Sequence, residues 1–544
     1  MKSSKLVAVL LSVVFLMTAC NTNPAGQAPT SAVVQAPAAP TYDDATQIVL
    51  SDSGITVDGA AVSTDVTAAV YTANDIVYYE SGKDFTYGEG SEKDAHSPDE
   101  AAVHTVVHIT KPGVYILSGK LSSGQIAVDL GDEAKKDPDA VVTLVLNGVD
   151  ITCEVAPAVI FYNVYECGTD DTEKASKDVD TSTAGANVII ADGTVNTVNG
   201  SYVEKIYKPD SVVLSDDKTE VEDADKLHKY DGAFYSKRSM NIFGGKENTG
   251  VLNIKAENEG LDSEMHLTIN GGNIHIESGN DGINTNEDGV SVTTVNGGKL
   301  TIKITGETGE GDGIDSNGWL VINGGTVIAA ACSNSADAGI DSDMGIHING
   351  GTVIATGHML DRIEDGGQNY AVFNFAQKQT GKETVTMKDQ DGKAILEVKP
   401  ENAYSILIFS SSDLKAGTYA LWSGGKQLAG SAGGMMGGPG MGSGGMGRPE
   451  HPDNMQPPAD GVQPPEGFTP PEGGNPPEEF TPPQGETPPE GLTPPEGGNR
   501  PEMPEGNRPG NAGGNNVGAQ EMVTDFVIRD GGNMFSGISQ NGEQ

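Results

Sequence analysis

A tripeptide that returns at a nearly constant interval constrains this fold more than any other feature. Asn-Gly-Gly occurs at Asn270, Asn296, Asn323 and Asn349, at spacings of 26, 27 and 26 residues. A period of this length is typical of repeat architectures, in which each repeat is one small structural unit. A second motif keeps the same phase and is rich in acidic residues and glycine: Glu259–Ser263, Asp281–Thr285, Asp312–Ser316 and Ala338–Ser342.

Short runs of alternating apolar residues lie between the two motifs, as in Leu267–Ile269, Ile274–Ile276 and Leu300–Ile302. Three such strands cannot bury their apolar side chains alone, but stacked repeats can. Strands of successive repeats would lie about 4.8 Å apart, with Gly-Gly at the corners and the Asn side chains stacked as an amide ladder. We therefore predict an all-β parallel β-helix, a solenoid. A β-propeller is the rival, but its blades need about 40 residues and four strands.

The first residues are typical of a bacterial export signal. Lys2 and Lys5 precede an apolar run, Leu6–Met17, which is short for a membrane span. The run ends in Leu-Met-Thr-Ala before Cys20, which resembles a lipobox although Met17 stands where Leu is commoner. This predicts a lipid anchor on Cys20 and exposure outside the cell; the alternative is an ordinary secretory signal. Membrane contact is expected only through the lipid.

Composition divides the chain into segments. A stretch rich in Ala, Pro and Thr follows the signal, and a later stretch is rich in Gly, Met and Pro-Pro-Glu-Gly units; neither composition can bury a core. Phe526-Val-Ile then resumes strand character. We predict a signal peptide, a flexible tether, the parallel β-helix, a C-terminal β cap, a disordered Pro/Gly/Glu-rich insertion and the final strand of the cap, at 1–20, 21–45, 46–365, 366–430, 431–519 and 520–544.

The net charge limits the possible partners. The chain carries 77 acidic and 33 basic residues, a formal net charge of −44. This balance argues against nucleic acid, whose phosphates need the opposite sign, and permits cation binding. With Cys20 lipidated, Cys153 and Cys167 could pair and leave Cys332 as a single thiol. The spacing of the cysteines does not fit a zinc site.

The in-phase acidic motifs predict a row of carboxylates along one corner. Stacked carboxylates repel one another and raise each other's pKa, and Ca²⁺, which takes 6–8 oxygen ligands, removes that repulsion. The alternative is that Asp-Gly is only good turn chemistry with solvated side chains. The residues of this acidic row, our calcium candidates, are Asp262, Asp281, Asn284, Asp288, Asp312, Asp315, Asp341 and Asp343.

The order and phase of several stretches resemble a clostridial carbohydrate-binding β-helix family. The stretches are Gly113–Gly119, Gly124–Asp129, Leu144–Ile151, Ile189–Asn196 and Gly232–Ser236, together with the Asn-Gly-Gly repeats. The resemblance covers roughly residues 45–430 and 520–544. It implies a right-handed parallel β-helix similar to pectate lyases, bound calcium, and binding of cellulose-type or polygalacturonate-type polysaccharide without known catalysis.

Sugar contacts are expected from aromatic and cationic side chains, because sugar faces stack on rings and uronates carry carboxylates. The candidates are Trp319, Tyr235, Lys237 and Arg238. Calcium could also bridge the acidic protein to an acidic polymer. Two alternatives stay open: a calcium-dependent, pectate-lyase-like enzyme with a Lys or Arg base, and a surface adhesin or stalk without a defined sugar. No nucleophile motif predicts a catalytic residue.

Overall fold

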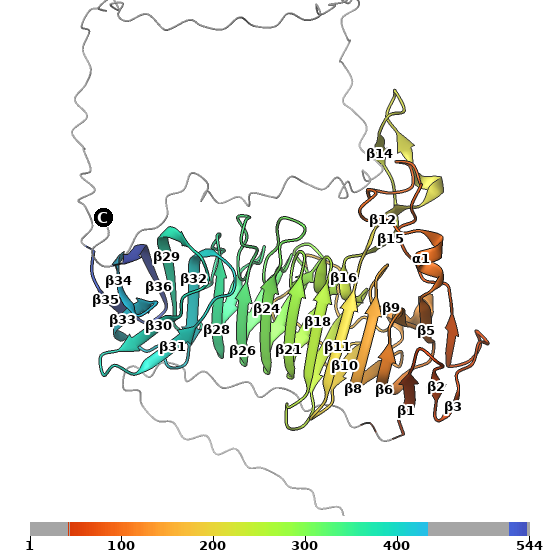
Figure 1. Cartoon of the computed structure of the whole chain (residues 1–544), viewed down its shortest axis with the longest axis horizontal. Coiled ribbons are helices and arrows are strands. Elements are labelled where there is room, and N and C mark those ends of the chain that lie inside the picture. The colour runs from red at the N-terminus through yellow and green to blue at the C-terminus, as the bar shows by residue number, and fades with distance from the viewer. Residues whose placement is uncertain (1–41, 43, 433–521, 541–544) are drawn as a thin grey trace, which may run out of the picture. The chain divides into compact units, whose positions relative to one another are not determined.

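A computed structural model describes residues 42, 44–432 and 522–540, and these residues are mostly β (Figure 1). Helix in this part of the chain is confined to α1 (Pro98–Ala102) and the 3₁₀ turns Asp132–Lys136 and Pro209–Ser211. None of the helices described is long and apolar enough to cross a bilayer. The predicted signal peptide with Cys20, most of the tether, and the low-complexity insertion except its first two residues lie outside the described residues.

Three parallel ladders of strands form most of the structure. Two of them share the long strands β6 (Gly113–Leu121) and β8 (Val142–Cys153). The N-terminal part of each of these strands belongs to the first ladder, and the C-terminal part belongs to the second. The first ladder continues through β10 (Ala186–Ile190), β17 (Met240–Gly244), β20 (Leu267–Ile269), β23 (Val292–Val295), β25 (Trp319–Ile322) and β27 (Ile346–Ile348).

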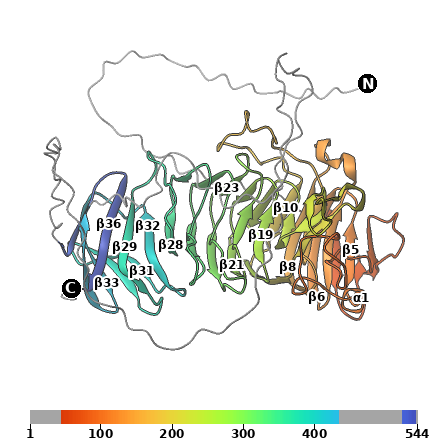
Figure 2. The ribbon, with the colours of Figure 1, turned by 90° about the horizontal axis from the view of Figure 1, so that it is seen from above.

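The second ladder runs beside the first and is drawn facing the viewer in Figure 1. After β8 it contains β11 (Val195–Gly200), β18 (Val251–Ala256), β21 (Asn273–Ser278), β24 (Lys299–Ile304), β26 (Thr326–Ala330) and β28 (Thr352–Gly357). The third contains β5 (Thr105–Ile109), β7 (Gly124–Asp129), β9 (Val159–Asn163), β16 (Gly232–Ser236), β19 (Glu259–Ser263) and β22 (Ile283–Thr285). Figure 2 shows these strands from above.

Strand alternation produces one continuous core between the ladders. In β18, β21 and β24 every second residue is buried, as Leu252, Ile274 and Leu300 are in successive strands at one register position. These aliphatic side chains are at most 1 % exposed. Stacked rows of this kind bury the apolar side chains that a single repeat would leave exposed to water.

The Asn-Gly-Gly repeat has the predicted role in the corners. The amide Nδ2 of Asn296 donates to Oδ1 of Asn270 at 2.9 Å, Asn323 donates to Asn296 at 2.9 Å, and Asn349 donates to Asn323 at 2.8 Å. The second glycine of each tripeptide has a positive φ, as at Gly298 (φ 80°), a conformation that side chains rarely adopt. The predicted amide ladder is therefore confirmed.

The C-terminal strands form a second core around aromatic side chains. They are β29 (Tyr370–Gln379), β30 (Val385–Asp389), β31 (Ala394–Val398), β32 (Tyr404–Ser411), β33 (Gly417–Ser423), β34 (Lys426–Ala432), β35 (Asp525–Ile528) and β36 (Gly532–Gln540). Strand β32 pairs antiparallel with β28 at the end of the second ladder. Strand β36 pairs with both β29 and β34. Phe526 and Phe535 pack on Phe373.

Between β11 and β16 the chain leaves the ladders in residues 201–231, which we call the excursion. It contains the hairpin of β12 (Val203–Tyr207) and β15 (Lys226–Tyr230), and the smaller β13 (Val213–Leu214) and β14 (Val221–Asp223). The sequence repeat gives no sign of it. The buried Nζ of Lys205 on β12 lies 3.0 Å from Oε1 of Glu89, which ties the excursion to the N-terminal segment.

The remaining strands of this part of the chain lie near its start: β1 (Thr46–Leu50), β2 (Thr56–Val57), β3 (Ala60–Ala61) and β4 (Val70–Ala73). Strand β1 pairs parallel with β6 and so extends the first ladder. Cys153, Cys167 and Cys332 all carry free thiols, so the pairing considered for Cys153 and Cys167 does not occur in this structure.

Candidate functional site

The predicted acidic row follows the third ladder and its continuation. Asp262 on β19 is in register with Asn284 on β22. Ile283 pairs with Ile314, so Asp315 follows Asn284 at the next position. The backbone N–H of Asp341 donates to the carbonyl of Ile314, which places Asp341 one step further along. The in-phase acidic motifs therefore do stack on one another.

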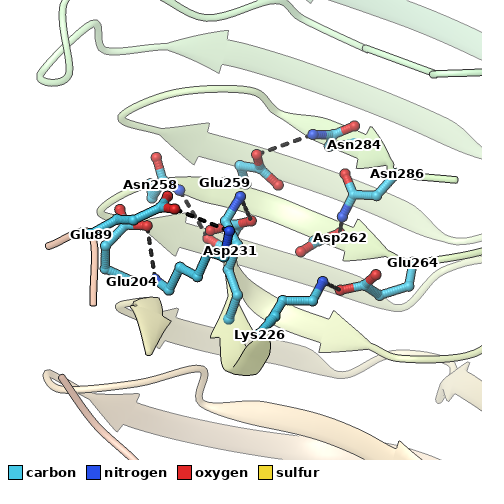
Figure 3. Close-up of polar contacts among 12 residues, drawn as sticks. Glu89, Glu204, Lys226, Asp231, Asn258, Glu259, Asp262, Glu264, Asn284 and Asn286 are labelled. Atoms are coloured by element: carbon cyan, nitrogen blue, oxygen red, sulfur yellow. Dashed lines mark hydrogen bonds and ion pairs between the residues drawn. The ribbon is translucent and has the colours of Figure 1, made fainter. Parts of the chain in front are cut away.

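Three oxygen atoms at the start of this row are buried and have no hydrogen-bond partner: Oε2 of Glu259, Oδ2 of Asp262 and Oδ1 of Asn284. We call these three residues the buried carboxylate cluster. The second Glu259 oxygen accepts from Asn284 Nδ2 at 3.1 Å, and the second Asp262 oxygen accepts from Asn286 at 2.8 Å (Figure 3). A buried polar atom without a partner is costly, so these three oxygens distinguish the cluster from the rest of the row.

The electrostatics of the cluster oppose its ionisation. Burial, together with the charges of Asp262 and Asp231, raises the pKa of Glu259 well above its usual range. Burial and the charges of Asp231 and Glu264 do the same to the pKa of Asp262. Glu259 is 5 % exposed and Asp262 is 0 % exposed. Both carboxyl groups therefore keep their protons to a higher pH than they would in water.

The excursion supplies the cluster with neighbours and with two nearby cations. The carbonyl of Asp231 accepts the backbone N–H of Glu259. Lys229 lies 3.2 Å from the Asp231 carboxylate, which raises the pKa of Lys229, and Lys226 lies 3.4 Å from Glu264. Figure 3 shows Lys226 reaching Glu264 beside the cluster. These ion pairs leave the orphan oxygens of the cluster unpartnered.

Other members of the row hold the backbone together. Oδ1 of Asp281 accepts the N–H of Asp312 at 2.7 Å, and Oδ1 of Asp312 accepts the N–H of Ala338 at 2.6 Å. Each carboxylate thus binds the backbone of the next repeat. Burial and the charge of Asp281 raise the pKa of Asp312 well above its usual range. These two carboxylates therefore stabilise the fold by linking successive repeats.

The far end of the row contains a second concentration of carboxylates. Burial and the charge of Asp361 raise the pKa of Asp341 to about 8. Both residues accept the N–H of Ser342, at 3.0 and 3.2 Å. Asp288 accepts from Asn317 at 2.9 Å. Burial and the charge of Asp288 raise the pKa of Asp343.

The four predicted sugar contacts do not lie in one site. Tyr235 is 1 % exposed and its hydroxyl donates to Glu264 at 2.5 Å, so its ring presents no open face. Arg238 is half-buried, and its Nε has no partner. Lys237 beside it is exposed. Trp319 is half-buried at the start of β25, on the first ladder.

Sequence reasoning missed Glu259, which opens the second motif at Glu259–Ser263 but was not selected as a ligand. Asp231-Gly232 was considered as a possible start of the acidic motifs, but Asp231 and the lysines of the excursion were not selected as site residues. The signal for Glu259 was its in-phase position before the glycine, which matches Asp281 and Asp312. Across the part of the chain that the structure describes, no three His, Cys, Asp or Glu side chains form a ready-made metal site. The orphan oxygens instead combine two carboxylates and one amide.

Comparison with known proteins identifies the class. The model of the family described as "Carbohydrate-binding domain-containing protein" matches residues 103–413, more than half of the chain. The chain therefore belongs to this carbohydrate-binding domain family, and the resemblance found in the sequence is confirmed. The family implies a polysaccharide partner. None of the curated proteins matches.

Among solved structures, one similar chain is the polysaccharide lyase-like protein from C. thermocellum, studied as a gadolinium derivative. The likeness covers 57 % of this chain and 90 % of that chain, at 20 % sequence identity and a TM-score of 0.33.

Proposed function

We propose that this protein is a lipid-anchored extracellular protein that binds acidic or cellulosic polysaccharide and uses bound calcium. The match of residues 103–413 to a carbohydrate-binding family is the observation that carries the binding function. The anchor rests on the lipobox-like sequence before Cys20. Lipid chains on Cys20 would hold the protein at the membrane surface, since each CH₂ group buried in the bilayer contributes roughly 0.8 kcal/mol to the free energy of membrane binding.

The fold of the binding domain, in this proposal, is a right-handed parallel β-helix. Three ladders that each receive one strand from a repeat support it, as do the shared registers of successive strands. The amide ladder and the single core between the ladders support it too. A β-helix gives a binding protein a rigid side wall whose residues repeat at a fixed spacing.

The chemistry of the buried carboxylate cluster supports the calcium part of the proposal. The orphan oxygens of Glu259, Asp262 and Asn284 are carboxylate and amide oxygens, the donors that Ca²⁺ prefers. A cation there would stabilise the ionised form of both carboxylates. Because Glu259 and Asp262 are buried, such a cation would act inside the fold and hold successive repeats together. The bridging of protein to polymer considered from the sequence is not supported at this cluster.

A pull-down of residues 21–544 with insoluble cellulose and with polygalacturonate tests this function, with and without excess chelator. We expect one polymer to retain the protein without being degraded, and we expect chelator to lower both retention and the melting temperature. Added Ca²⁺ should restore both. Asp262→Asn, which keeps the shape and removes the charge, should reduce the response to Ca²⁺.

Three results would contradict all or part of the proposal. Failure of both polymers to retain the protein at any calcium concentration would refute carbohydrate binding of these classes. Release of unsaturated uronides that absorb in the ultraviolet would show a lyase. A melting temperature that chelator and Ca²⁺ leave unchanged would refute the calcium part alone.

A further inference from the structure

The outward face of the second ladder carries two rows of polar side chains. On β18, β21 and β24 the residues that alternate with the core point outward. Parallel register places Asn253, His275 and Thr301 in one row. The same register places a charged row beside it, made of Lys255, Glu277 and Lys303. Figure 1 shows these strands side by side.

A depression of about 290 Å³ lies on this face. Its lining includes Asn199 from β11, Asn253 and Lys255 from β18, and His275 and Glu277 from β21. Amide, imidazole, ammonium and carboxylate groups therefore converge on one hollow from three successive strands. Carbohydrate sites combine such hydrogen-bonding groups because each sugar presents several hydroxyls that donate and accept.

Two side chains on this face have unused bonding capacity. Lys255 is exposed and, among the residues that the structure describes, forms no ion pair. Lys303, by contrast, lies 3.4 Å from both Glu277 and Glu401. The buried Oγ1 of Thr301 has no hydrogen-bond partner. In a chain of net charge −44, an unpaired lysine beside polar groups is complementary to a carboxylate on a ligand.

The polar face has a definite end. Further along the ladder, Ile328 on β26 and Ile354 on β28 take the outward positions and pack on the aromatic core of the C-terminal strands. Asn402 donates to the carbonyls of Ile304 and Ala331, both at 2.7 Å, and so fixes these strands against the ladder. The exposed polar rows therefore extend over β11, β18, β21 and β24 and are closed at β26.

We propose that this face binds a uronate-containing polysaccharide, with the polymer running across the strands and a sugar carboxylate at Lys255. Adjacent strands lie about 4.8 Å apart, which is close to the advance per sugar of an extended pyranose chain. Successive sugars would then meet successive strands at equivalent positions. This inference rests on the proposed carbohydrate-binding function and names the site and the ligand class.

The test measures the affinity of residues 21–544 for polygalacturonate and for cellulose in excess Ca²⁺. The double variant Lys255→Ala/His275→Ala should bind polygalacturonate at least about tenfold more weakly, since it loses a charge-assisted contact and a neighbouring hydrogen bond. Its melting temperature should stay unchanged because both side chains point away from the core. Lys255→Arg should retain most of the affinity.

Lys246→Ala is the matched control, since Lys246 is also exposed but lies in the turn after β17. It should bind like the wild type. Equal polygalacturonate affinity of the double variant and this control would refute the site and leave the proposed function standing. A loss confined to cellulose would refute the uronate assignment. A wild-type protein that binds neither polymer would refute the proposed function and this inference together.

Discussion

At the scale of single residues, the structure uses similar polar side chains for opposite purposes. The asparagines of the Asn-Gly-Gly repeats form hydrogen bonds with one another along the amide ladder. Asp281 and Asp312 are satisfied by backbone N–H groups. Glu259 and Asp262, only a strand away, keep oxygens without partners. The contrast singles out the buried carboxylate cluster as the site that we propose for calcium.

This contrast predicts an unusual dependence of stability on pH. In the unfolded chain the carboxyls of Glu259 and Asp262 lose their protons near pH 4, whereas burial raises their pKa in the folded state. Above pH 4 the unfolded state therefore binds fewer protons, and stability falls as pH rises, by at most about 1.4 kcal/mol per pH unit for each group. The raised pKa of Asp341, about 8, extends the same trend.

Thermal melts in chelator between pH 4 and pH 8 check this expectation. The melting temperature should fall with rising pH, and Ca²⁺ should remove much of the fall. Asp262→Asn should make the slope shallower, and Asp216→Asn, a change in an exposed turn, should leave it as it is. A melting temperature that rises with pH in chelator would contradict the raised pKa values.

The acidic row also shows which features of the site could be predicted from the sequence. Its stacking was predictable because the motifs recur in phase with the Asn-Gly-Gly period. The surroundings of Glu259 and Asp262 were not predictable, because they include Asp231 of the excursion, whose residues 201–231 carry no repeat. Tyr235 was expected at a sugar site because the sequence pattern does not reveal that the excursion covers it. In the structure, the ring of Tyr230 from the excursion packs against the ring of Tyr235, with 5.1 Å between the ring centroids.

At the scale of elements, the ladders follow from alternating apolar residues, whereas the excursion is held by long-range contacts that include one buried ion pair. The alternation made the ladder strands predictable one by one. The hairpin of β12 and β15 has less apolar alternation, and its anchor joins Lys205 to Glu89 across more than a hundred residues of sequence. No local pattern could reveal that pairing.

The anchor predicts a measurable difference between two lysines of the excursion. Lys205→Ala removes the ammonium group that pairs with Glu89 in a mostly buried site, where Lys205 is 3 % and Glu89 22 % exposed. We expect a loss of about 3 kcal/mol in the free energy of unfolding. Lys226→Ala removes a pair with Glu264 in which the lysine is 46 % exposed, and it should cost less than about 1 kcal/mol. Urea unfolding of both variants checks this, and equal losses would refute the anchoring role.

At the scale of the whole molecule, the strands that follow residues 433–521 pair with strands that precede them. Strand β35 pairs with β33, and β36 pairs with β29 and β34. The renewed strand character at Phe526 made this return of the chain predictable. The partners of each strand were not, because antiparallel pairs beyond the repeat have no period to fix their register.

This pairing predicts that a chain cut within residues 433–521 remains one particle. A specific protease site introduced there should give two fragments on a denaturing gel that elute together in native size exclusion. Phe526 and Phe535 hold the smaller fragment through their contacts with Phe373. Phe535→Ala should weaken this association, and Val527→Ala, at an exposed position, should not. Separate elution of the wild-type fragments would contradict the prediction.

The amide ladder has a consequence for how such proteins gain and lose repeats during evolution. Asn296 and Asn323, inside the ladder, each donate and accept one bond of the same kind, so their corners are chemically interchangeable. Duplication or loss of one 26- or 27-residue unit would leave both neighbours with the partner they already recognise. The molecule can therefore lengthen or shorten by whole units during evolution, while the specialised strands at either end stay as they are.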